Sequence, residues 1–159
     1  MSYQAVILTV SDSCAAGTRT DTSGPAIRAM LENAGFAVQA MQTVPDEEGQ
    51  ISAAIVHACD ILQADLVVTT GGTGLSARDV TPEATLAVLD REIRAIPVAM
   101  WVEGLKSTPR AMLSRAVAGI RGHTLVLNVP GSEKAARENL GAVVVTLDHA
   151  LRMLAGGGH

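Results

Sequence analysis

The chain has 159 residues, of which 48% are hydrophobic and 18% are charged, so we expect one compact domain over residues 1–159. Its net charge of −4 and aromatic content of 2%, without a basic cluster, argue against nucleic-acid binding, which needs a cationic surface and stacking rings. No stretch reaches the roughly 18 apolar residues of a membrane span, and the start lacks the charged region of a signal peptide. We therefore expect a cytoplasmic protein that contacts no membrane and whose two cysteines are free thiols.

Short apolar runs alternate along the chain with stretches of helical spacing. Continuous apolar runs indicate strands buried on both faces, and apolar residues three and four apart indicate helices. In chain order we expect a strand at 5–10, a loop at 14–22, a helix at 23–35, a strand at 36–44, a helix from 45 to about 62, a strand at 66–68, helices at 81–91, 98–105 and 108–119, a strand at 124–129, a helix from 133 and a frayed tail from 156. This alternation predicts a three-layer α/β/α fold with a mostly parallel sheet and a helical insertion at 93–118.

Small, polar or glycine-rich loops follow four of these strands. Ligands of open parallel sheets bind beyond the carboxyl ends of the strands, so these loops are expected to converge on one rim. The loops are Ser11-Asp12-Ser13, Pro45-Asp46-Glu47, Gly71-Gly72-Thr73-Gly74 and Asn128-Val129-Pro130-Gly131-Ser132.

Two of the loops combine glycines with a following helix start, which suits phosphate binding by backbone N–H groups and a helix dipole. After Gly71–Gly74, the run Thr81-Pro82-Glu83 has the pattern of a helix start with Thr81 as its cap. Neither loop matches GxGxxG or the P-loop pattern. For either one, an ordinary tight turn remains the alternative.

Two aspartates on these loops are candidates for metal or phosphate chemistry. Asp79 is expected either to hold Mg²⁺ near phosphates or to form a turn. Asp46 stands where a helix N-cap belongs, and capping is the favoured interpretation from the local sequence alone. Arg78 would pair either with a phosphate or with an acid. The scattered histidines show no Ser-His-Asp spacing, which argues against a hydrolase triad.

Seven ordered motifs spread over about residues 5–155 resemble the molybdenum-cofactor biosynthesis family. The longest runs from Thr69 to Thr85 and reads TTGGTGLSARDVTPEAT. The others are Leu8-Thr-Val-Ser-Asp-Ser13, Asp21-Thr-Ser-Gly-Pro25, Val44-Pro-Asp-Glu47, Met112-Leu-Ser-Arg115, Gly119-Ile-Arg-Gly122 and Asn128-Val-Pro-Gly-Ser132.

Within that family the chain is most similar to the molybdopterin adenylyltransferases, including the amino-terminal domain of gephyrin. The resemblance implies transfer of AMP from ATP to the terminal phosphate of molybdopterin with Mg²⁺, a homotrimer, and a partner protein that inserts molybdenum. It places the two functional aspartates at Asp46 and Asp79, as catalytic and metal-binding residues, and a pterin-associated serine at Ser114. We expect nucleotide contacts from Ser11, Asp12, Gly71, Gly72, Thr73 and Gly74, and substrate contacts from Ser114, Arg115, Pro130, Gly131 and Ser132.

Two other functions remain open from the sequence. A protein of the same fold can bind molybdopterin without adenylylating it, although the paired aspartates favour the enzyme. A similar domain occurs in damage-inducible proteins as a nucleotide- or pyridine-processing hydrolase. The absence of a hydrolytic constellation and of a further domain in these 159 residues counts against that function.

Overall fold

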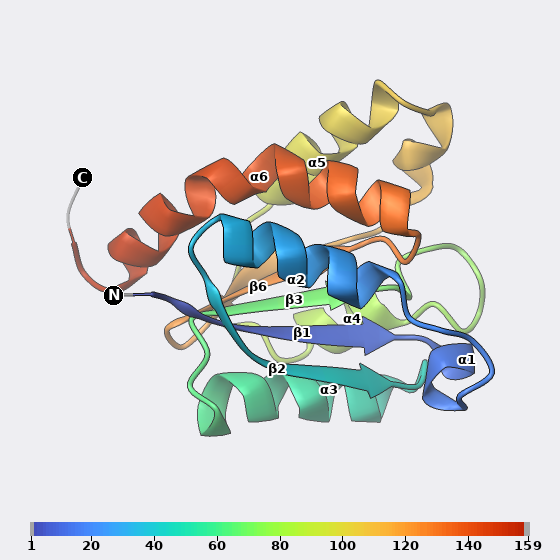
Figure 1. Ribbon diagram of the computed structural model, residues 1–159, viewed down its shortest axis with the longest axis horizontal. Coiled ribbons are helices and arrows are strands. Elements are labelled where there is room, and N and C mark those ends of the chain that lie inside the picture. Colours follow the sequence, from blue (N-terminus) through green and yellow to red (C-terminus); the bar gives the residue numbers. More distant parts are fainter. Residues whose placement is uncertain (1, 158–159) are drawn as a thin grey trace.

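The computed structural model describes residues 2–157 and contains a six-stranded sheet between two layers of helices (Figure 1). The strands lie in the order β2-β1-β3-β6-β5-β4, in which β2, β1, β3 and β6 are parallel and β5 and β4 are antiparallel to their neighbours. Their bounds are β1 Gln4–Val10, β2 Ala37–Val44, β3 Leu66–Thr70, β4 Arg91–Glu92, β5 Ala118–Arg121 and β6 Thr124–Val129. The predicted α/β fold with a mostly parallel sheet is confirmed.

The helices cover both faces of the sheet (Figure 1). Those on one face are α2, α5 and α6, and those on the other are α3 and α4. The bounds of all helical segments are α1 Asp12–Ala15, α2 Ser23–Asn33, α3 Glu48–Val56, η1 His57–Ile61, α4 Thr81–Leu86, α5 Ala95–Leu105, η2 Pro109–Leu113 and α6 Glu133–Leu154.

Alternate residues of the central strands belong to two separate hydrophobic cores. Ile7 packs beneath α2 and α6, whereas the next residue, Leu8, packs against α3 on the opposite face. Val68 and Val67 of β3 are divided in the same way. Because successive side chains of a strand point to opposite faces, a continuous apolar run supplies both cores at once. This burial holds the carboxyl ends of β1, β3 and β6 in fixed positions.

The predicted helix over 108–119 is wrong. Only the 3₁₀ helix η2 forms there, and the chain then enters β5, which pairs with β6 as a hairpin. The exposed fractions of Met112 and Leu113 are 64% and 49%, so this segment has no apolar stripe that a longer helix would bury. Gly122 turns the hairpin with a φ of +57°, a conformation that glycine adopts easily.

Three local predictions near the rim also need correction. The first two residues of the loop expected over 14–22 belong to the short helix α1, which Ser11 caps by accepting a hydrogen bond from the Cys14 N–H at 3.2 Å. Thr81 does not cap α4; its buried hydroxyl donates to the Gly71 carbonyl at 2.9 Å. The capping role favoured for Asp46 is wrong as well, because α3 begins after Glu47 and has no side-chain cap.

Of the tail expected to fray, residues 158–159 lie outside the described part.

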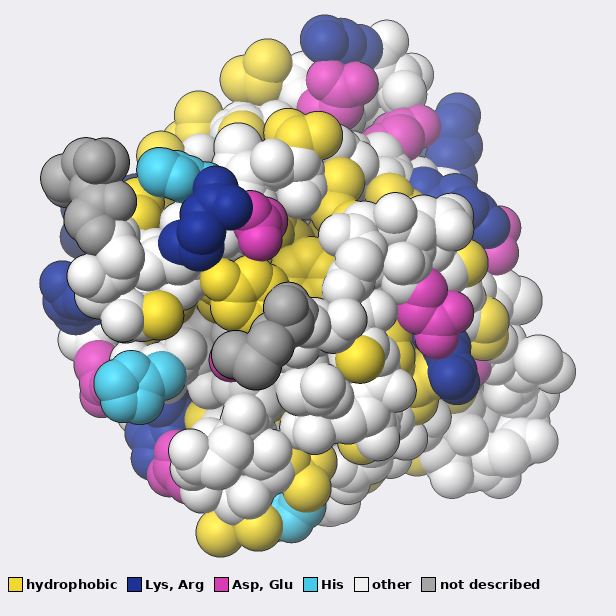
Figure 2. Space-filling view, turned by 60° about the vertical axis from the view of Figure 1, so that its left-hand side comes forward, with side chains coloured by type: hydrophobic (Ala, Val, Ile, Leu, Met, Phe, Trp, Pro, Cys, Tyr) yellow, Lys and Arg dark blue, Asp and Glu magenta, His cyan; other side chains and the backbone are white. Residues whose placement is uncertain are grey.

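The predicted helix over 98–105 is confirmed, and it begins earlier, at Ala95. Pro97 lies in its first turn, where a backbone N–H has no intrahelical partner to lose. Among residues 2–157, no helix combines the length and apolar character needed to span a bilayer. The end of the molecule that carries the chain termini shows acidic and basic side chains interspersed around hydrophobic ones (Figure 2).

Candidate functional site

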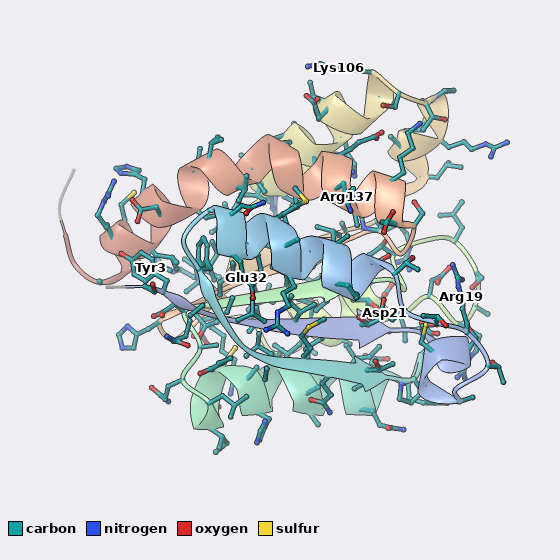
Figure 3. All side chains as sticks on the ribbon, in the orientation of Figure 1. Tyr3, Arg19, Asp21, Glu32, Lys106 and Arg137 are labelled. Carbon is teal, nitrogen blue, oxygen red and sulfur yellow. The ribbon has the colours of Figure 1, made fainter. Side chains whose placement is uncertain are left out.

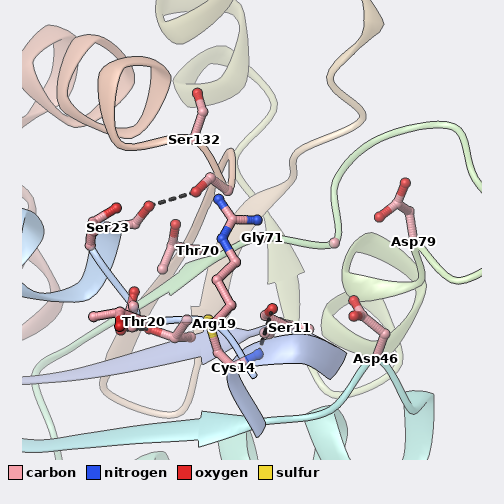
Figure 4. Close-up of a pocket in the computed structure, with 16 residues that line it drawn as sticks. Ser11, Cys14, Arg19, Thr20, Ser23, Asp46, Thr70, Gly71, Asp79 and Ser132 are labelled. Carbon is pink, nitrogen blue, oxygen red and sulfur yellow. Dashed lines mark hydrogen bonds between the residues drawn. The ribbon is translucent and has the colours of Figure 1, made fainter. Parts of the chain in front are cut away.

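The loops after the four parallel strands meet at one end of the sheet, as the sequence predicts. They line a cavity of about 360 Å³, which we call the first cavity (Figure 4). Ser11 follows β1, Asp46 follows β2, Gly71 follows β3, and Gly131 and Ser132 follow β6. The fold therefore places residues that are more than a hundred positions apart around one space.

The two glycine turns touch each other at the floor of this site. A Cβ on Gly131 would lie 3.2 Å from Gly71 Cα, and a Cβ on Gly71 would lie 2.2 Å from the Val10 carbonyl oxygen. Gly71 and Gly72 have φ values of +99° and +69°, which disfavour any residue with a Cβ. The turns are thus held by backbone contacts between β1, β3 and β6, and backbone groups are left to face a ligand.

A reciprocal pair of hydrogen bonds links the loops after β1 and β2. The Asp12 N–H donates to Asp46 Oδ2 and the Asp46 N–H donates to Asp12 Oδ1, each at 2.9 Å. Arg78 donates through Nε and Nη2 to the Asp12 carboxylate at 3.1 and 3.0 Å, and through Nη2 to Glu47 at 3.0 Å. We expected Arg78 to pair either with a phosphate or with an acid, and in the structure it pairs with two acids.

This arrangement shifts the two carboxyl groups in opposite directions. Hydrogen bonds from Arg78 lower the pKa of Asp12 below its ordinary value of 3.8. Burial raises the pKa of Asp46, and the negative charges of Asp12 and Asp79 add to the effect. A cation or an N–H donor in the first cavity would offset the unfavourable charge at Asp46.

Asp79 and Arg115 lie on either side of the loop that follows β3. The Asp79 carboxylate accepts from the Ser76 N–H at 3.0 Å, so the predicted turn role is present, and the side chain also lines the first cavity. Arg115, which we expected to contact substrate, donates to the Gly74 carbonyl at 2.8 Å and the Asp79 carbonyl at 2.6 Å, and also pairs with Glu83. Its guanidinium thus holds the loop that presents Asp79.

A second cavity, of about 500 Å³, adjoins the first. Ser114 and Pro130, which we expected to contact substrate, line it, and so do Thr73 and Gly74, which we expected to contact the nucleotide and which do not line the first cavity. Four residues line both cavities and therefore mark the place where they meet: Gly72, Asp79, Gly131 and Ser132. At this junction Ser132 caps the long helix α6 by accepting from the Ala135 N–H at 3.2 Å, so the positive end of the helix dipole faces the site.

Several residues of the site were not identified from the sequence. Arg19 is the one basic residue that lines the first cavity, and no described residue forms an ion pair with it. Its side chain extends from the loop after α1 toward Gly71 and Ser132 (Figure 4), and with Asp21 it lies at the end to which the strands point (Figure 3). The loop between α1 and α2 has no periodicity, so its sequence gave no signal that a side chain turns inward.

The same loop is anchored to the rim by side-chain hydrogen bonds. Asp21 accepts from the Thr9 hydroxyl at 2.7 Å and from the Gly24 N–H at 3.0 Å. Ser23 donates its hydroxyl to the Gly131 carbonyl at 2.5 Å (Figure 4). The run Asp21-Thr-Ser-Gly-Pro25 is one of the ordered motifs, and these contacts explain its residues as supports of the site.

The carboxylates of Asp46 and Asp79 line the same cavity, as does that of Asp21. Among residues 2–157, no group of three or more His, Cys, Asp or Glu side chains converges as a complete metal site. Any cation bound here would need further oxygen ligands from a bound molecule or water.

Comparisons with known proteins show which family the chain resembles. The family model described as "Probable molybdopterin binding domain" matches residues 6–149. A molybdopterin adenylyltransferase of Helicobacter pylori is 38% identical over 154 residues, which cover 94% of this chain and 86% of that protein. The crystal structure of the molybdopterin biosynthesis enzyme MoaB from Thermus thermophilus is 49% identical, covers 97% of both chains and superposes with a TM-score of 0.92.

Some relatives are much longer than this chain. Gephyrin of Dictyostelium discoideum is 41% identical over 158 residues, which cover 93% of this chain and 22% of gephyrin. The chain thus spans about a quarter or less of that relative. With a family match over residues 6–149 and full-length similarity to a solved relative, the chain belongs to the molybdopterin-binding domain family of molybdenum-cofactor biosynthesis.

Proposed function

We propose that the protein is a molybdopterin adenylyltransferase, which transfers AMP from ATP to the terminal phosphate of molybdopterin and releases pyrophosphate. The observation that carries the proposal is the pair of adjoining cavities, because a transfer between two bound molecules needs two sites that share a boundary. The relatives named molybdopterin adenylyltransferase support it.

In this mechanism ATP occupies the first cavity and molybdopterin the second. A terminal phosphate oxygen of molybdopterin attacks the α-phosphorus of ATP, a new P–O bond forms, and the bond from that phosphorus to the bridging oxygen breaks as pyrophosphate leaves. The nucleophile is already anionic, so no strong general base is needed. Catalysis then depends on positioning and on neutralising charge at the junction lined by Gly72, Asp79, Gly131 and Ser132.

Arg19 would contact the phosphates that leave as pyrophosphate, and the backbone N–H groups of the glycine turns would hold the α-phosphate. Asp46 and Asp79 would hold Mg²⁺, an ion that one or two carboxylates and substrate phosphates commonly bind. When bound, Mg²⁺ would neutralise negative charge on the triphosphate. Asp12 and Ser11 would act through the loops they support, since Asp12 hydrogen-bonds to Asp46 and Ser11 caps α1.

We also propose that the protein is a homotrimer, as the family resemblance implies. The supporting observation is an apolar groove of about 580 Å³ that includes Val98, Trp101, Leu105 and Met112. The exposed fractions of Val98 and Met112 are 48% and 64%, and apolar patches of this kind are commonly covered by a partner.

The test of the activity is AMP transfer from labelled ATP to molybdopterin by the parent and by Asp79→Asn at saturating Mg²⁺. Asparagine keeps an acceptor for the Ser76 N–H but loses the charge, so folding should persist while transfer falls by about a hundredfold or more. Asp90→Asn is the matched control, because Asp90 also accepts a backbone N–H, from Gly122, but lies outside both cavities.

Two outcomes would contradict the proposal. Transfer by Asp79→Asn within about threefold of the parent, under roughly 1 kcal/mol in the barrier, would remove Asp79 from the mechanism. A parent that binds molybdopterin and ATP without transferring AMP would be a binding protein of the same fold.

A further inference from the structure

The far end of the second cavity carries two polar residues of α6 that the mechanism does not use. Glu138 and Asn139 line this cavity together with Ala135 and Ser132. Ala135, Glu138 and Asn139 follow Ser132 by three, six and seven residues, so their side chains lie on one face of the helix. The cavity therefore extends from the junction at Ser132 to a polar end about two turns further along α6.

The Glu138 carboxylate is held in place but keeps acceptor capacity. Its Oε1 accepts from the Ser107 hydroxyl at 3.0 Å, which ties α6 to the segment after α5. No described residue forms an ion pair with Glu138, although nine other acids in residues 2–157 have one. A carboxylate accepts only, and it has about four lone-pair positions. One donor from Ser107 leaves room for a pair of N–H donors from a ligand.

Asn139 beside it is 4% exposed and has its amide nitrogen fixed by donation to the Ala135 carbonyl at 2.9 Å. That bond orients the side-chain oxygen as a further acceptor. Ala111 and Leu113 on η2 add apolar surface to the same cavity. A flat ring with adjacent N–H donors on one edge matches this combination of acceptors and apolar walls.

The direction of the bound substrate follows from the junction. If the phosphate of molybdopterin meets ATP at Gly131 and Ser132, its ring system must extend away from the first cavity, toward Glu138. Ser132 and Glu138 are six residues apart, which is roughly 9 Å along a helix axis. The end of a pterin opposite its phosphate-bearing side chain is the pyrimidine edge, which carries the N3–H and the 2-amino group side by side.

We propose that Glu138, positioned by Ser107, recognises the N3–H and 2-amino donors of the pterin ring and so determines which heterocycle the site accepts. This inference rests on the proposed function for the identity of the ligand. It assigns to α6 a specificity role separate from the chemistry at the junction.

The test compares pterin with lumazine, which carries oxygen in place of the 2-amino group, by direct fluorescence-monitored binding. The parent should bind pterin about tenfold or more tightly than lumazine, because lumazine presents an acceptor to the carboxylate. Glu138→Gln still accepts from Ser107 but offers one acceptor and one donor group, so the preference should fall to within about threefold. Glu133→Gln, on the exposed first turn of the same helix, should keep the parent's preference.

A parent without a preference for pterin, including one that binds neither compound, overturns the inference, and so does a Glu138→Gln variant that keeps the preference. If Glu138→Gln fails to fold, Glu138→Asp serves instead, because it retains the charge and should retain the preference with weaker binding of both compounds. AMP transfer is measured separately. Transfer without a pterin preference leaves the proposed function intact, and a preference without transfer leaves the recognition intact.

Discussion

Gly72→Ala should destabilise the fold even without a ligand. Gly72 has a φ of +69°, and a Cβ placed on it would lie 2.1 Å from Thr81 Oγ1 and 3.2 Å from Asp46 Oδ1. The Thr81 side chain is fully buried, and its hydroxyl donates to the Gly71 carbonyl at 2.9 Å. A methyl group therefore has to displace a buried hydroxyl whose hydrogen bond joins the glycine turn to α4.

The expected loss of unfolding free energy in Gly72→Ala has two parts. A residue with a Cβ in a left-handed conformation costs about 1–2 kcal/mol. Breaking the Thr81–Gly71 bond leaves a buried carbonyl without its donor, which costs about 1–3 kcal/mol. The sum is about 2–5 kcal/mol, a large fraction of the stability of an ordinary domain.

Gly122→Ala separates these two parts. Gly122 has a similar φ of +57°, but a Cβ there would meet no atom within 4 Å. It should show only the conformational cost of about 1–2 kcal/mol. The assay is equilibrium urea unfolding of both variants and the parent. Equal losses of unfolding free energy in Gly72→Ala and Gly122→Ala would refute the contact with Thr81 as the cause.

Three further predictions concern charge and assembly. Arg19→Gln should raise the KM for ATP by about tenfold or more, because a charged contact to the phosphates is lost, and an unchanged KM would remove Arg19 from the nucleotide site. Because the pKa of Asp12 is lower in the folded protein, the stabilisation it contributes is present above its ordinary value of 3.8 and is lost as the pH falls through the lowered value. When the urea midpoint is plotted against pH, Asp12→Asn should therefore lose less stability than the parent on the acid side. An unchanged acid side would contradict this. Sedimentation should detect a trimer at micromolar concentration, and Val98→Asp should shift it toward monomer; a parent that sediments as a monomer would contradict the proposed assembly.

Much of the fold was predictable because its strands are continuous apolar runs. Ile7 and Leu8 show why: both are buried, on opposite faces, so the run itself indicates a strand covered on two sides. The convergence of four loops on one rim then followed from parallel topology. The hairpin of β5 and β6 was not predicted, because β5 reads Ala-Gly-Ile-Arg and contains a single β-branched residue, although Gly122 at the first position of the two-residue turn is a hairpin signal.

The site was predictable where its residues directly follow a strand. It was less predictable where a side chain contacts residues that are distant in the sequence. Asp79 and Gly131 stand at such loops, and both line the predicted rim. Arg115 was assigned to substrate, but its neighbours in space, the Gly74 and Asp79 carbonyls, are about 40 residues distant in the chain and give no local signal. The catalytic, metal-binding and ligand-contact roles of these residues remain predictions, as does the partner that inserts molybdenum.

The reciprocal hydrogen bonds between Asp12 and Asp46 limit how a substrate can enter. The backbone N–H of each residue donates to the carboxylate of the other, so two hydrogen bonds join the loops after β1 and β2. We expect both bonds to break in the same local unfolding event. Hydrogen exchange at these two amides would accordingly be slow and would occur in the same opening event. The loop between α1 and α2 forms another wall of the first cavity and carries Arg19, and it is joined to β1 through the side chains of Asp21 and Thr9.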